Sequence, residues 1–110
     1  MTQIRIVDRH RKPLEIGQKL RVQHCVGRYG QVRIDEGVID QIDTTFRGVT
    51  IKLTQPGYRY FRDRREPVAA GQPLYLALSG EFDIARGQFH CYRKHDDFEH
   101  GHEAWAEIVD

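Results

Sequence analysis

Apolar and polar residues alternate along most of the chain in short runs, and this period is typical of β-strands. The clearest alternation covers residues 18–26, where Leu20, Val22 and His24 fall on one face of an extended strand. No window carries the 3.6-residue period of an amphipathic helix. The pattern therefore predicts an all-β fold.

The best-defined local prediction is a hairpin between residues 37–42 and 49–53. Both runs are rich in β-branched side chains, and the connection 43–48 ends in Gly48, which we expect to take the positive φ of a bulged loop. Further strands are predicted at 4–7 as an edge strand, and at 58–62, 74–78, 89–93 and 104–109, with glycines between them.

The inward positions of these strands predict the core. It is expected to contain Leu20, Val22, Ile39, Ile42, Val49, Ile51, Leu74, Leu76 and Phe89. Trp105, the only tryptophan, is expected to anchor the last strand in this core. With 110 residues, no linker and no internal repeat, residues 1–110 are predicted to form a single β domain.

Residues 17–53 carry a resemblance to a known fold family. The segment 17–22 reads Gly-Gln-Lys-Leu-Arg-Val, glycines follow at 27 and 30, and 37–42 reads Gly-Val-Ile-Asp-Gln-Ile before Val49 and Ile51. This succession resembles the opening of Src-homology-3-like small β-barrels of the KOW type. The resemblance implies a small barrel, here extended by extra strands, and the alternative fold is a two-sheet β-sandwich. It implies no activity by itself.

Charge is distributed unevenly along the chain although the formal net charge is only +1. Residues 1–65 hold 14 Lys and Arg against 7 Asp and Glu, whereas residues 66–110 hold 3 against 9. Two interpretations remain open: a basic face for a polyanion, or two halves whose charges intermix on one surface.

The strongest candidate site is the stretch 58–65, where aromatic residues alternate with arginines. We predict that it contacts single-stranded nucleic acid by ring stacking and phosphate binding. Its residues are Tyr58, Arg59, Tyr60, Arg62, Arg64 and Arg65. The alternative is an edge strand that its arginines keep soluble. Other cations that could extend the surface are Arg5, Arg9, Arg11, Lys12, Arg28 and Arg33.

Metal binding and catalysis receive less support. Histidines 90, 95 and 100 are five residues apart, so no regular element places them on one face, and no metal is predicted. His100 and His102 would be the best pair if a metal bound. Ser79, the only serine, has no nucleophile-elbow flanks. Cys25 and Cys91 are predicted to be reduced and buried in strands.

These observations favour a non-catalytic small β-barrel binding module, with nucleic acid as the leading partner and no cofactor. A protein-protein interaction or assembly module is the second hypothesis, and a metal-dependent enzyme using the C-terminal histidines is the third. The first residues lack an apolar signal segment and no run approaches the ~18 apolar residues of a membrane span, so the expected location is the cytoplasm. The oligomeric state is left open.

Overall fold

The structure is a computed structural model that describes residues 4–26, 31–62, 64–94 and 103–109. The all-β prediction is confirmed, since every regular element in these ranges is a strand. The described residues contain no helix long and apolar enough to cross a membrane. The strands are β1 (Arg5–Val7), β2 (Lys19–Val26), β3 (Gln31–Asp43), β4 (Gly48–Leu53), β5 (Gly57–Phe61), β6 (Arg64–Val68), β7 (Pro73–Ala77), β8 (Glu81–Asp83), β9 (Gln88–His90), β10 (Tyr92–Lys94) and β11 (Glu103–Val109).

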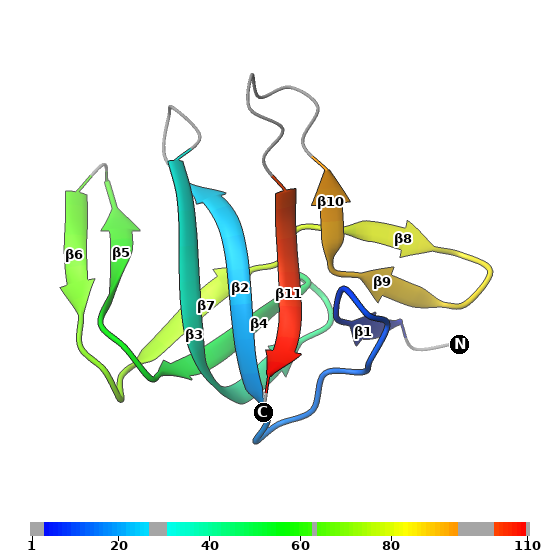
Figure 1. The fold of residues 1–110 in the computed structure, drawn as a ribbon, viewed down its shortest axis with the longest axis horizontal. Helices are drawn as coiled ribbons and strands as arrows, with labels where there is room; N and C mark the ends of the chain where they lie inside the picture. The colour runs from blue at the N-terminus through cyan, green and yellow to red at the C-terminus, as the bar shows by residue number, and fades with distance from the viewer. Residues whose placement is uncertain (1–3, 27–30, 63, 95–102, 110) are drawn as a thin grey trace.

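The strands form three sheets (Figure 1). The largest has the order β10-β11-β2-β3-β4-β7, and all of its neighbours are antiparallel. A three-stranded sheet has the order β1-β9-β8, with β1 parallel to β9 at one edge, and β5 and β6 form a separate hairpin. None of the sheets closes into a barrel through the strands described, so the arrangement is closer to the sandwich alternative.

The long strand β3 bends the large sheet. Its first half pairs with β2, and its second half turns to pair with β4, which passes behind β2 and β11 (Figure 1). The register shifts between Ile39 and Gln41, which leaves Asp40 as a bulge. Gly37 permits the close approach of the two strands, because a Cβ at this position would lie 2.4 Å from the carbonyl oxygen of Lys52.

The predicted core is confirmed apart from one residue. All of its members are buried except Ile42, which is only partly buried and packs against the rest. The core also takes in apolar residues that the prediction omitted: Ile6, Leu14, Leu53, Val68, Leu78, Cys91 and Ala106. The prediction for Trp105 is wrong, since its ring is only partly buried and lies beneath the guanidinium group of Arg9, 4.9 Å from the ring centroid.

Two local predictions need correction. The run 89–93 is not one strand, because β9 ends at His90 and joins the small sheet, whereas β10 begins at Tyr92 and joins the large one. Gly48 does not take a positive φ, and Arg47 does, at 55°. Gly48 instead makes room for a side chain: a Cβ there would lie 2.1 Å from the hydroxyl oxygen of Tyr75, and the exposed ring would have to move.

Candidate nucleic-acid interface

The predicted site forms a β-hairpin that extends from the large sheet beside β3 (Figure 1). In β5 and β6, Tyr58 pairs with Pro67, Arg59 with Glu66 and Tyr60 with Arg65. Because strand residues alternate between faces, positions 58 and 65 belong to one face of the hairpin, and positions 59 and 64 belong to the other. The side chain of Tyr60 lies outside the described part of the structure. Arg62 lies in the turn, with φ 50°. The hairpin thus brings all six predicted residues together but divides their cations between two faces.

Tyr58 and Arg65 make the closest contact on the aromatic face. The guanidinium carbon of Arg65 lies 3.9 Å from the centroid of the Tyr58 ring, which is within the range of a cation–π interaction. Tyr58 remains 38% exposed. Since Arg65 covers one face of the ring, an incoming base can stack either on the planar guanidinium or on the part of the ring that stays open.

Three arginines of the hairpin form no ion pair with a described carboxylate. Arg59, Arg64 and Arg65 are exposed, and no carboxylate within the described ranges forms an ion pair with any of them. Elsewhere, Glu36 holds two cations, with distances of 3.2 Å to Lys19 and 2.9 Å to Arg21. The hairpin therefore carries positive charge that is available to an anion.

A buried ionic cluster anchors the hairpin to β3. One carboxylate oxygen of Asp35, Oδ2, lies 2.7 Å from His24 Nε2 and 2.7 Å from Arg33 Nε. The Asp35 side chain is only 4% exposed. Arg33 also donates from Nη2 to the backbone carbonyl of Tyr58, so one guanidinium links the buried carboxylate to the hairpin.

The pKa of Asp35 reflects two opposing effects. Burial raises the pKa, because it disfavours the charged form, while the hydrogen bonds from His24 and Arg33 lower it. The hydrogen bonds together with the nearby positive charge prevail, and the pKa of Asp35 lies below its ordinary value. Asp35 is thus held as a carboxylate, which keeps Arg33 in place. The alternation in β3 did not single out this cluster, because a lone Asp in a strand is usually solvated.

The remaining cations of the first half do not extend this surface as a group. Arg33 reaches the hairpin, but its charge is taken up by Asp35. Arg9 lies over the rings of Tyr92 and Trp105, and Arg11 pairs with Asp83 at 3.1 Å. Arg5 belongs to β1, which lies across the molecule from β5 and β6 (Figure 1). Arg28 lies outside the described residues. Away from the hairpin, the charges therefore intermix.

The candidate metal ligands are not gathered in the part of the chain that the structure describes. Those ranges contain no group of three His, Cys, Asp or Glu residues that could hold a metal ion. His90 uses its Nε2 to contact the backbone carbonyl of Arg9 at 3.0 Å. His95, His100 and His102 lie outside the described residues, as does the side chain of Cys25.

Cys91 is a free and fully buried thiol, which confirms that half of the cysteine prediction. Burial, assisted by the negative charge of Asp8, raises the pKa of Cys91 from 9.0 to about 12. In a Cys25→Ser variant at pH 8, we expect the remaining thiol to react with Ellman's reagent only after unfolding. A native reaction as fast as that of the urea-unfolded chain would contradict this burial.

No protein-family model, curated protein or solved structure matches the chain.

Proposed function

We propose that the protein is a non-catalytic binding module that holds single-stranded nucleic acid on the β5–β6 hairpin. The observation that carries the proposal is that Arg59, Arg64 and Arg65 are exposed and form no ion pair with a described carboxylate, on the same hairpin as the exposed Tyr58 ring. Arginine side chains bind phosphates, and a base of any type can stack on the tyrosine ring or on the guanidinium group above it. We also retain the resemblance of residues 17–53 to Src-homology-3-like small barrels as a proposal about their fold, and the consecutive antiparallel order of β2, β3 and β4 is compatible with it.

The salt dependence of binding tests the proposal. We expect a labelled oligothymidylate to bind weakly, with a log-log salt slope of about −0.7 for each phosphate contacted. Arg64→Ala and Arg65→Ala should each flatten this slope by about one contact, because each removes a cation that displaces counterions. Fluorescence anisotropy at several salt concentrations measures both the affinity and the slope.

Two control variants distinguish binding at the hairpin from non-specific electrostatic attraction between the oligonucleotide and the rest of the protein. Arg93→Ala removes the same charge from β10, at the opposite edge of the large sheet, and should leave the slope unchanged. Tyr58→Ala should weaken binding by about fivefold or more with a nearly unchanged slope, since stacking displaces no counterions. An Arg93→Ala effect equal to that of Arg64→Ala would show that the hairpin is not the interface.

A second candidate function is a protein-interaction module. The outer face of β3 exposes three aliphatic side chains, with Val32 at 40%, Ile34 at 54% and Val38 at 38%. Val32 and Ile34 are neighbours on this face, and Glu36 separates them from Val38. Neighbouring exposed apolar residues on a sheet are a common feature of protein interfaces. This function becomes the better account if the oligonucleotide fails to bind at low salt and high micromolar protein.

A further inference from the structure

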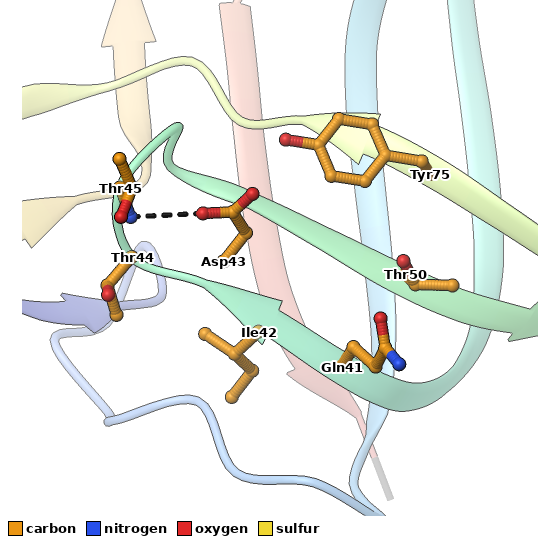
Figure 2. A pocket seen from close by; sticks show the side chains of 7 residues that line it. All are labelled: Gln41, Ile42, Asp43, Thr44, Thr45, Thr50 and Tyr75. Atoms are coloured by element: carbon orange, nitrogen blue, oxygen red, sulfur yellow. Dashed lines mark hydrogen bonds between the residues drawn. The ribbon is translucent and has the colours of Figure 1, made fainter.

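A polar hollow lies at the outer face of β3, β4 and β7, on the part of the sheet beyond the bulge (Figure 2). It is open to solvent, has a volume of about 540 Å³ and is lined by Gln41, Ile42, Asp43, Thr44, Thr45, Thr50 and Tyr75. Its floor follows from the strand register, since Gln41 pairs with Thr50 and Thr50 pairs with Tyr75. These three side chains therefore form one row across three adjacent strands.

The two ends of the hollow are fixed by local structure. Asp43 Oδ1 accepts hydrogen bonds from the backbone N–H groups of Thr45 at 3.0 Å and Phe46 at 3.1 Å, which holds the carboxylate at the turn. The Tyr75 ring extends across β4, with its hydroxyl directed toward Asp43 (Figure 2). Gly48 leaves room for this ring, because a Cβ there would overlap the hydroxyl. Asp43 is thus positioned before any ligand binds.

The polar groups of the hollow have hydrogen-bonding capacity that the protein does not use. The side chains of Gln41, Thr50 and Tyr75 form no hydrogen bond with any other described residue, and Asp43 Oδ2 accepts none either. Together they offer an amide, two hydroxyls and a carboxylate oxygen, which can donate and accept at neighbouring points. Tyr75 is 50% exposed, so it also presents apolar ring surface.

We propose that this hollow binds a neutral sugar ring. A pyranose carries neighbouring hydroxyls that both donate and accept hydrogen bonds, and its ring C–H groups form an apolar face that packs against an aromatic side chain. The hollow contains a carboxylate and no cation among its lining residues, so it disfavours phosphates and other anions. It is therefore chemically distinct from the arginine-rich hairpin, and this proposal does not depend on the nucleic-acid function.

Amide chemical shifts provide the test. We expect glucose, galactose or mannose, titrated separately into ¹⁵N-labelled protein, to shift the amides of Thr45, Phe46 and Thr50, with a dissociation constant of about 1–10 mM because the site is open. Tyr75→Ala should weaken sugar binding by about tenfold or more. Asp43→Asn keeps the oxygen that caps the turn but loses the charged acceptor, and should weaken binding to a similar degree.

Matched variants make the result decisive. Tyr58→Ala removes a tyrosine from the hairpin and should leave sugar binding unchanged, while Tyr75→Ala should leave oligonucleotide binding unchanged. Thermal unfolding of each variant establishes that it is folded. The proposal is overturned if none of the three sugars shifts these amides, if Tyr75→Ala binds sugar as well as the original chain, or if propylammonium binds more tightly than the sugars and is lost in Asp43→Asn.

Discussion

Asp8→Ala is expected to lower the free energy of unfolding by about 3 kcal/mol. The Asp8 side chain is fully buried, and its two oxygens accept three backbone N–H groups. Oδ1 accepts from His10 and Lys12, both at 2.8 Å, and Oδ2 accepts from Ile108 at 3.0 Å. The carboxylate therefore joins the turn after β1 to the last strand. Each orphaned buried donor costs about 1–3 kcal/mol, and water recovers part of this cost at the exposed His10 and Lys12.

Urea unfolding measures this loss of stability, and two further variants show what causes it. Asp8→Asn retains one acceptor oxygen for the turn but presents an amide N–H₂ group to Ile108, so we expect an intermediate loss. Asp40→Ala removes an exposed carboxylate that lies 4.0 Å from Lys52, and it should change stability by no more than about 0.5 kcal/mol. A loss of less than about 1 kcal/mol in Asp8→Ala would show that the backbone groups find other partners.

The sequence predicts the strands of this fold better than their arrangement. Alternation placed Leu20 and Val22 in the core, because these two apolar residues are neighbours on the inward face of β2. It did not find β6, whose residues are mostly exposed and include Pro67. It also did not divide β9 from β10, because Cys91 continues the apolar pattern while the backbone changes sheets. Sheet membership depends on long-range pairing, which local periodicity does not encode.

The candidate site was predicted because tyrosines and arginines occur together within the eight positions 58–65. In the structure, the register of β5 and β6 brings these nearby residues together in one hairpin. The contacts that matter outside this stretch could not be found in the same way. Arg33 lies 25 residues from Tyr58 in sequence, yet it donates to the Tyr58 carbonyl. Asp8 and Ile108 are 100 residues apart. The polar hollow was also missed, because a carboxylate, an amide and two hydroxyls on three strands form no sequence motif.

Arg33→Met is expected to have the second large effect, because it removes the guanidinium but keeps an apolar stem of similar length. The variant leaves the buried Asp35 carboxylate with only His24 as a side-chain partner, and breaking such a pair typically costs about 3 kcal/mol. It also removes the link to Tyr58. We therefore expect lower stability in urea together with faster hydrogen exchange at the amides of β5 and β6.

The pH dependence of unfolding shows whether the Asp35 charge causes this loss. The folded pKa of Asp35 is lowered, so Asp35 contributes stability above its unfolded value of about 3.8, and this contribution is lost as pH falls through the folded pKa. Arg33→Met removes one of the two hydrogen bonds that lower the pKa, so the folded pKa rises toward the unfolded value. The variant should therefore lose less stability than the original chain as pH falls. In an Asp35→Asn background the same substitution should cost much less, since no buried charge is left unpaired. If Arg33→Met lowers the free energy of unfolding equally with Asp and with Asn at position 35, Arg33 stabilises the fold through packing alone. The ion pair with Asp35 would then not anchor the hairpin.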